Sequence, residues 1–294
     1  MGSGTGERDE TIRWDLACPA KPSRVAGTSM AGFRDRGDAP VDLRVVPHPT
    51  VTLALVFGPG TPLVDDPAGG RHRGSFVAGL GTGSAGEVRV RGEEIAGVQV
   101  RLSPAVAFAA LGVSPDELSG AVVTLDELWG REAARIRERL DEAPTWQHRF
   151  ALTEELLARR CAEAPPAHPE VVWSWRRIVA GRGLVRVEEL AAEVGWSRKR
   201  LWSRFQAQIG LPPKRAANLV RFDHAVHRLA AGDRAGRVAA ESGYADQSHL
   251  HRDIAIRTGA TPATVPGSPW LAVDALKWGN RAGNISSRPG RPPL

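Results

Sequence analysis

Cysteine is scarce in this sequence. Its 294 residues include only two, Cys18 and Cys161, which lie far apart and in no metal-ligand spacing. A disulfide framework is therefore excluded as the organising feature, and the composition fits a reducing cytoplasm. Long apolar runs are missing as well. No stretch approaches the roughly 20 apolar residues that span a bilayer, and the polar, acidic N-terminus lacks the apolar run of a signal peptide. We expect a cytoplasmic protein with no membrane partner.

Signals for catalysis are absent or lie in the wrong context. The sequence has no Gly-x-Ser-x-Gly, Walker or His-Glu-x-x-His motif. Residues 81–86 match the dinucleotide fingerprint Gly-x-Gly-x-x-Gly, but that site needs a helix N-terminus directly after it to hold the pyrophosphate. Residues 87–91 alternate like a strand, so a plain glycine loop is favoured. We predict that the chain is not an enzyme and has no cofactor.

Histidine spacing gives no metal site. His249 and His251 lie two residues apart in a stretch expected to be helical, whereas ligands on one helix face would be three or four apart. His48 and His72 could meet inside a barrel, although nothing in their spacing indicates it. No metal is predicted.

Charge is distributed unevenly along the chain. Residues 171–267 contain sixteen Lys and Arg against eight Asp and Glu, a net charge of +8. Residues 1–170 carry a net charge of −5 and residues 268–294 one of +3, which together give the overall +6. A basic surface is often only a solvated face, but it is also what binding to phosphates through counterion release requires.

An internal repeat occupies the same basic stretch. Residues 188–262 contain one pattern twice, first at a step of 48 residues and then, after one extra residue in the turn, at a step of 49. The matching pairs are Ala191/Ala239, Glu193/Glu241, Gly195/Gly243, Trp196/Tyr244, Leu201/Leu250, Phe205/Ile254, Gly210/Gly259 and Pro213/Pro262. Each copy predicts a short helix, a turn with glycine and a second helix, which is the outline of a helix-turn-helix.

One helix is expected between the copies, over residues 213–231. Its apolar stripe consists of Ala216, Val220, Ala225, Val226 and Leu229. Proline near its start and Gly232 just past its end are the expected boundaries. Some 19 residues at about 1.5 Å each span roughly 28 Å, and major-groove faces on one side of DNA lie about 34 Å apart. A single chain could therefore place two reading helices one turn apart.

The two copies resemble the DNA-binding domain of the AraC/XylS transcriptional regulators. The first, LAAEVGWSRKRLWSRFQAQIGLPP at 190–213, has that family's Ala, Gly-aromatic-Ser, Leu, Phe and Gly-x-x-Pro. The second, VAAESGYADQSHLHRDIAIRTGATP at 238–262, has its Gly-Tyr-x-Asp-Gln-Ser-His-Leu run and closing Gly-x-x-Pro. Ile254 replaces the family's usual Phe and keeps an apolar plug. The resemblance covers roughly 172–265, about a third of the chain.

Residues on the second helix of each copy are the candidates for contact with DNA. Leu201 and Phe205 in the first copy, and Leu250 and Ile254 in the second, are the apolar plugs that we expect to face the core. Positions on the other side of each helix therefore face outward, and by resemblance these are the positions with which the family contacts DNA. The candidates are Arg198, Lys199, Arg200, Trp202, Ser203, Gln206, Gln247, Ser248, His251 and Arg252. Lys199 and Arg252 could read guanine and Gln247 adenine, whereas Arg198, Arg200 and Arg204 would meet phosphates. Trp202 either contacts thymine methyls or sugar edges or packs on a neighbouring helix.

The first half of the chain predicts strands followed by helices. The expected strands are 51–57, 76–80, 87–91 and 98–102, the last two as a hairpin around 92–97. The expected helices are 104–111, 131–140, 145–161 and one that begins with a Thr-x-x-Glu capping box at 124–127. The arrangement loosely resembles N-terminal sensor domains of the same family. The helices of 131–160 either form a dimer contact or pack on their own sheet.

The fold class is therefore α+β, with an N-terminal β-barrel or sheet followed by helices and a C-terminal all-α domain. The predicted parts are a regulatory domain at 1–164, a linker at 165–171, the tandem helix-turn-helix at 172–267 and a basic tail at 268–294 that its composition predicts to be disordered. We predict a sequence-specific, nucleoid-associated regulator that binds double-stranded DNA. Its further candidate partners are a small-molecule effector, a second copy and, for an activator, RNA polymerase. The alternatives are an effector-binding or metal-dependent barrel merely tethered by its DNA-binding half, and a nonspecific DNA-compacting protein.

Overall fold

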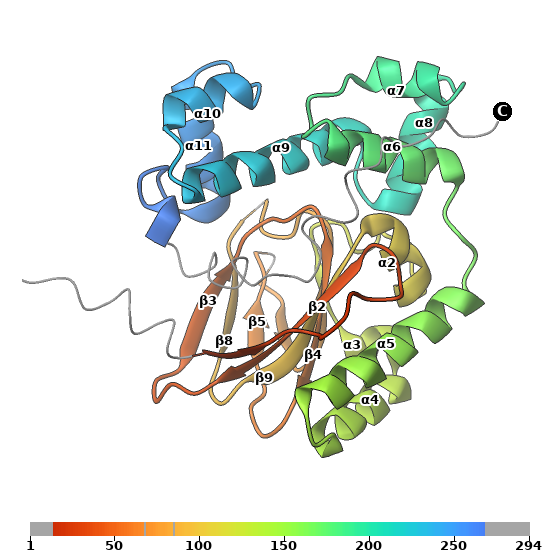
Figure 1. Ribbon diagram of the computed structural model, residues 1–294, viewed down its shortest axis with the longest axis vertical. Coiled ribbons are helices and arrows are strands. Elements are labelled where there is room, and N and C mark those ends of the chain that lie inside the picture. Colours follow the sequence, from red (N-terminus) through yellow and green to blue (C-terminus); the bar gives the residue numbers. More distant parts are fainter. Residues whose placement is uncertain (1–13, 68, 85, 268–294) are drawn as a thin grey trace, which may run out of the picture.

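The computed structural model describes residues 14–67, 69–84 and 86–267. Two sheets make up most of the first half, and helices make up the second (Figure 1). The predicted tail at 268–294 lies outside the described residues. Among the residues described, no helix has both the length and the apolar character needed to cross a bilayer.

Ten strands in the described part of the chain form two open antiparallel sheets. Their order is β1-β2-β9-β4-β7-β10 in the larger sheet and β3-β8-β5-β6 in the smaller one. The strands are β1 (Trp14–Ala17), β2 (Thr28–Asp35), β3 (Val41–Val45), β4 (Val51–Phe57), β5 (Leu63–Asp65), β6 (Arg71–Arg73), β7 (Phe76–Ala78), β8 (Val88–Gly92), β9 (Ala96–Leu102) and β10 (Val122–Thr124). The first half is thus a pair of sheets and not a closed barrel.

The predicted hairpin of 87–91 with 98–102 is wrong, although both segments are strands. β8 pairs with β3 and β5 in the smaller sheet, and β9 pairs with β2 and β4 in the larger one. Each is a central strand with both edges occupied, so neither has a free edge for the other. The chain crosses between the sheets at the short connection that contains Glu94, whose φ is +50°. The alternation of apolar and polar residues predicted one buried face for each of β8 and β9, but it did not predict which strands they pair with.

The helices occur where they were predicted, but the strands do not all precede them, because β10 lies between the first and second helices. They are α2 (Pro104–Leu111), α3 (Leu125–Trp129), α4 (Arg131–Glu142), α5 (Trp146–Glu163), α6 (Pro169–Ala180), α7 (Val187–Glu193), α8 (Arg198–Ile209), α9 (Pro213–Ala230), α10 (Ala235–Glu241) and α11 (Gln247–Thr258), with a 3-10 turn, η1, at Val265–Gly267. The predicted linker 165–171 covers the connection from α5 to α6 and the first residues of α6. The capping box at Thr124 and Glu127 is present.

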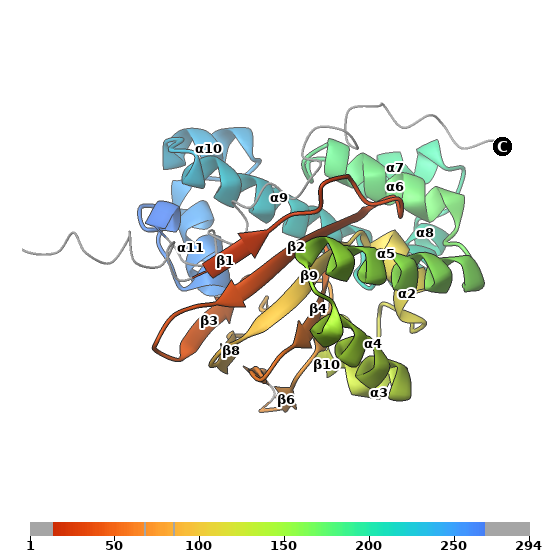
Figure 2. The same ribbon diagram turned by 60° about the horizontal axis from the view of Figure 1, so that its bottom comes forward.

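The apolar stripes of α4 and α5 pack within their own half of the chain. Ala133, Ile136 and Leu140 are buried, and α4 contacts β4 while α5 contacts β2 and β9. Figure 2 shows these helices beside the larger sheet. This is the second of the two predicted alternatives, so a dimer contact through these helices would have to use their outward-facing side chains.

One hydrophobic core joins the two halves of the chain. A single cluster of buried apolar side chains runs from β4 and β9 through α2 into α6, α8 and α9. Figure 1 shows α9 lying above the sheets, with α10 and α11 at one of its ends and α6, α7 and α8 at the other. The first half of the chain and the helical half therefore share one hydrophobic core.

Candidate DNA interface and an interdomain cavity

The first helix-turn-helix consists of α7 and α8. Gly195 has a φ of +69° in the turn, a left-handed conformation that glycine adopts without strain. Ser197 then caps α8, its hydroxyl accepting a hydrogen bond from the Arg200 N–H at 3.2 Å. Leu201 and Phe205 are fully buried one turn apart. Because the plug residues hold α8 against the core, the opposite face of its first turns is left exposed.

The second unit, α10 and α11, has the same construction. Gly243 has a φ of +68°, and the Asp246 carboxylate accepts a hydrogen bond from the His249 N–H at 2.7 Å at the start of α11. Leu250 and Ile254 are fully buried, so the apolar plug predicted at Ile254 is confirmed. The hydroxyl of Tyr244 donates to Asp253 at 3.0 Å, and burial raises the pKa of this phenol.

The helix between the units has the predicted buried stripe. All five predicted positions are buried, together with Leu219 and Phe222. At its end, Arg228 donates to Asp233 at 2.6 Å and forms an ion pair with Glu241 of α10, also at 2.6 Å. These contacts hold the start of the second unit to α9. The hydrogen bond from Arg228 also lowers the pKa of the Asp233 carboxyl.

Nine of the ten predicted contact residues are exposed on α8 and α11. They are Arg198, Lys199, Arg200, Trp202, Ser203, Gln247, Ser248, His251 and Arg252. Gln206 is the exception: it is half-buried, and its Oε1 lies inside the protein without a hydrogen-bond partner. Gln206 lies three residues before the fully buried Ile209, at the edge of the buried face of α8.

Several of these side chains have intramolecular contacts that limit their reach. Arg198 lies 3.3 Å from the Glu188 carboxylate, and the Arg200 guanidinium stacks over the Trp196 ring at 4.5 Å. Trp202 is 51% exposed, so packing on a neighbouring helix accounts for only part of its surface.

The capping residues Ser197 and Asp246 were not among the predicted site residues. Their signal was present in the sequence, since Ser and Asp directly before a helical run are preferred N-caps. A side-chain acceptor at the start of each reading helix fixes where that helix begins, and hence which residues occupy its first exposed turn.

Loops in the first half of the chain contact both helix-turn-helix units. Near the first, the Ser114 hydroxyl donates to the carbonyl of Ala207 in α8 at 3.2 Å. Near the second, Arg257 of α11 donates to the Ser84 hydroxyl at 3.1 Å. Ser84 belongs to the glycine loop that matched the dinucleotide fingerprint, and the chain runs from this loop into β8, as predicted, and not into a helix.

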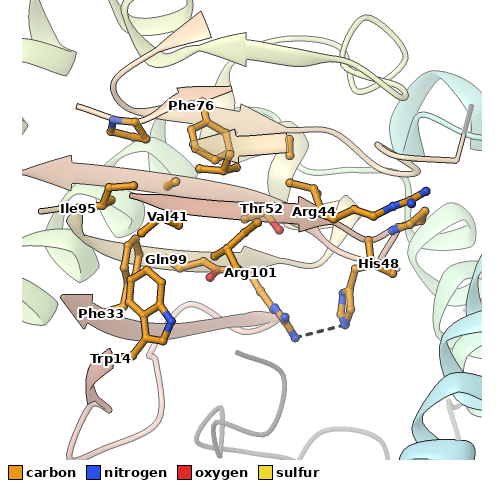
Figure 3. A pocket seen from close by; sticks show the side chains of 18 of the residues that line it. Trp14, Phe33, Val41, Arg44, His48, Thr52, Phe76, Ile95, Gln99 and Arg101 are labelled. Carbon is orange, nitrogen blue, oxygen red and sulfur yellow. Dashed lines mark hydrogen bonds between the residues drawn. The ribbon is translucent and has the colours of Figure 1, made fainter. Parts of the chain in front are cut away.

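A cavity of about 190 Å³ lies between the sheets and α9. Figure 3 shows Trp14 and Phe33 toward one end and Arg44 and His48 toward the other. The Arg101 guanidinium lies 3.3 Å from His48 Nε2. Four lining residues come from α9: Phe222, Asp223, Val226 and His227. The wall is mostly apolar, with polar groups gathered near α9. This cavity could not be predicted from the sequence, because its lining comes from seven strands, their loops and one distant helix.

The two histidines that could have met in a barrel are apart. His48 Nδ1 lies 2.8 Å from the Thr50 hydroxyl, and His72 Nε2 lies 2.9 Å from Asp66. Within the described ranges there is no cluster of three or more His, Cys, Asp or Glu side chains able to hold a metal ion.

Comparison with known proteins places the repeat in a family. Residues 190–266 match the family model described as a helix-turn-helix domain. No curated protein sequence matches the chain significantly.

Solved structures with a related arrangement include two of ToxT from Vibrio cholerae and one of the AraC-like activator CuxR. ToxT of strain O395 is 10% identical over 81% of this chain and 96% of its own, with a TM-score of 0.44. The same protein bound to (E)-4-(8-methylnaphthalen-1-yl)but-3-enoic acid is 9% identical over 84% and 99%, with a TM-score of 0.46. CuxR is 14% identical over 83% and 93%, with a TM-score of 0.26. Because these scores are low, the assignment depends on residues 190–266 and on the two capped, matching units. Residues 190–266 therefore carry a helix-turn-helix domain behind a β-rich first half, and its two matching units resemble those of AraC-type regulators.

Proposed function

We propose that this protein is a sequence-specific transcriptional regulator that reads two adjacent major grooves with α8 and α11. The observation that carries the proposal is the pairing of two capped helices with exposed polar first turns, held at opposite ends of α9. The positive charge of residues 171–267 supports it, since phosphate contacts supply much of the affinity for DNA. A protein that acts on DNA in this way works in the cytoplasm, on the nucleoid.

Individual roles follow from the surroundings of each side chain. Lys199 and Arg252 are exposed and could bind guanine, and Gln247 could bind adenine. Arg198 and Arg200 are already held by Glu188 and Trp196, a placement that suits contacts to phosphate more than to bases. Trp202 would place its ring on thymine methyls or sugar edges, and Gln206 has the weakest case because it is half-buried.

Selection from a random DNA library with the full-length protein tests this function. We expect selected sites with two conserved blocks about 10–10.5 base pairs apart, centre to centre. At fixed salt, the selected site should be preferred over random DNA by about 10³-fold or more. Equal binding to all sequences would identify a nonspecific DNA-compacting protein instead.

We further propose that a small, largely apolar molecule with a polar group enters the cavity and controls DNA binding. Since α9 supplies part of the wall, such a ligand would contact both the sheets and the helix that connects the two helix-turn-helix units. A compound screen by thermal shift on the full chain tests this. Ala54→Leu, which fills the cavity, should abolish any hit, whereas Ala151→Leu on the exposed surface of α5 should not. Hits that survive Ala54→Leu would place the ligand elsewhere.

The alternative that the first half does the main work, with the DNA-binding half only tethering the chain, predicts a different result in the same screen. Turnover of a hit compound, or tight uptake of a metal, would assign the main activity to the sheets and make DNA binding secondary. We propose that the chain is not an enzyme, in keeping with its helix-turn-helix assignment.

A second copy and RNA polymerase remain proposed partners. A dimer would give selected DNA sites with two-fold symmetry, and light scattering on the full-length protein would give twice the mass of one chain.

A further inference from the structure

The α6–α7 loop makes an unusual approach to α9. Arg182 and Gly183 have successive left-handed φ values of +53° and +75°. A side chain at Gly183 would collide with the carbonyl of Ala217 and the backbone of Arg221, both in α9. The loop therefore lies flat on the connecting helix, a placement that only glycine permits at this position.

This approach places Leu184, which precedes the first helix-turn-helix unit, against the second unit, α10 and α11. Leu184 is 51% exposed, although it is a large apolar side chain. Its Cδ2 would lie only 2.6 Å from a Cβ atom at Gly243, the glycine in the turn between α10 and α11. The loop ahead of the first unit thus touches the turn of the second.

Arg221 of α9 holds the same turn from the side. Its Nη1 donates to the Gly243 carbonyl at 3.1 Å, and its guanidinium stacks over the Tyr244 ring at 4.7 Å. The turn of the second unit is therefore fixed by the connecting helix and by the loop of the first unit together.

The repeat provides an internal comparison. Gly195 occupies the equivalent turn of the first unit with a φ of +69°, against +68° for Gly243. A Cβ at Gly195 would meet no heavy atom within 4 Å. The two glycines thus share their backbone conformation, and Gly243 alone of the two has a neighbour from the other unit.

We propose that Leu184 and Gly243 form a brace that sets the orientation of α11 relative to α8, and so the half-site spacing that the protein accepts. Leu184 is a positioning residue in this proposal, acting through the turn and not on DNA. Arg221 and Arg228 of α9 already hold the second unit to the connecting helix, and the brace adds a contact between the two units that does not pass through that helix. The effect on spacing rests on the proposed function, whereas the brace itself does not.

Distance measurements between spin labels test the brace without DNA. Ala192 and Ala240 are matched, exposed positions on α7 and α10, outside the predicted reading residues. We would label Ala192→Cys and Ala240→Cys in the full chain after replacing Cys18 and Cys161 with alanine. The expected result is one narrow distance distribution.

Matched glycine variants then distinguish displacement of Leu184 from backbone strain as the cause of an altered distance distribution. Gly195→Ala and Gly243→Ala carry the same left-handed strain, but only the second displaces Leu184, whose side chain can swing away. We expect Gly243→Ala to shift or broaden the distribution, Gly195→Ala to leave it unchanged, and Leu184→Ala added to Gly243→Ala to remove the shift but leave the distribution broad. Equal behaviour of the two glycine variants would overturn the proposal.

Leu184→Ala alone covers the case in which Gly243→Ala fails to fold. It should broaden the distribution at unchanged helical circular dichroism, and an unchanged distribution would overturn the brace. In DNA selection, the same variant should accept a wider range of half-site spacings with the base preferences of each block retained. A protein that selects no DNA but shows the expected label distances would keep the brace and refute the proposed function.

Discussion

The imidazole of His48 lies 3.3 Å from the carboxylate of Asp223, measured from Nε2 to Oδ1. His48 follows β3 in the first half of the chain, and Asp223 lies in the middle of α9. The same carboxylate oxygen is 3.6 Å from His227 Nδ1. A group of ionisable side chains therefore joins the sheets to the helix that connects the two reading units, at the wall of the cavity.

The His48–Asp223 pair should contribute modestly to the free energy of unfolding. In a double-mutant cycle with His48→Ala and Asp223→Ala, we expect a coupling energy of about 0.2–1 kcal/mol. Urea unfolding of the four proteins gives the measurement. A coupling energy of zero would show that the pair adds nothing to stability.

Arg252→Ala should weaken binding to the selected DNA site by about 1–3 kcal/mol and relax the base preference at one position. The reason is that Arg252 is exposed on α11 and can form two hydrogen bonds with guanine. Competition binding at fixed salt measures both effects. Arg137→Ala removes the same charge from the exposed face of α4 and should leave affinity and preference unchanged. A uniform loss on every sequence would reassign Arg252 to the phosphates.

Thr124→Ala should lower the free energy of unfolding by about 0.5–2 kcal/mol, the usual range for an N-cap. The Thr124 hydroxyl accepts from the Glu127 N–H at 3.2 Å, and the Glu127 carboxylate accepts from the Thr124 N–H at 2.8 Å. Thr124→Ser keeps the acceptor and is the matched control. If serine were as destabilising as alanine in a denaturant titration, the lost methyl group would be the cause.

Glu127→Gln should remove part of the acid sensitivity of the protein. Hydrogen bonds from Thr124 hold the pKa of the Glu127 carboxyl below its usual value. Its contribution to stability is therefore present above the unfolded pKa, about 4.3, and is lost as the pH falls through the lower folded value. Unfolding measured between pH 3 and 5 should show a shallower decline for Glu127→Gln than for the parent, and parallel curves would contradict this.

His224→Gln should flatten the stability profile on the acid side of neutrality. Burial lowers the pKa of His224, with the charges of Arg182, Arg228 and His227 adding to the effect. The unfolded chain therefore takes up a proton first, and stability falls as the pH drops below about 6.5, by at most about 1.4 kcal/mol per pH unit. Thermal unfolding from pH 5 to 8 measures the slope. His251→Gln, at an exposed position, should retain the parent slope.

The reading units could be predicted because their signals are local. Caps at Ser197 and Asp246, glycines at 195 and 243 and plugs four residues apart each act within one or two turns of a helix. The repeat doubled every such signal, so both units and the helix between them appear close to their predicted bounds. Side-chain direction followed from helix periodicity for all but Gln206, whose position beside a plug the pattern could not resolve.

The sheets could be predicted only as a set of strands. Alternation in β8 and β9 identified buried faces, but pairing depends on edges offered by β2, β3, β4 and β5, which lie far away in the sequence. A strand's hydrogen bonds are made with another strand, so its partner is not encoded in its own residues.

By itself, the sequence determined that two matching helix-turn-helix units stand on one chain, since helices, caps and turns form from neighbouring residues. The tertiary structure alone decided which strands pair, where a cavity opens against α9 and that Leu184 reaches Gly243. Each of these depends on groups separated by tens of residues, brought together only when the shared core forms.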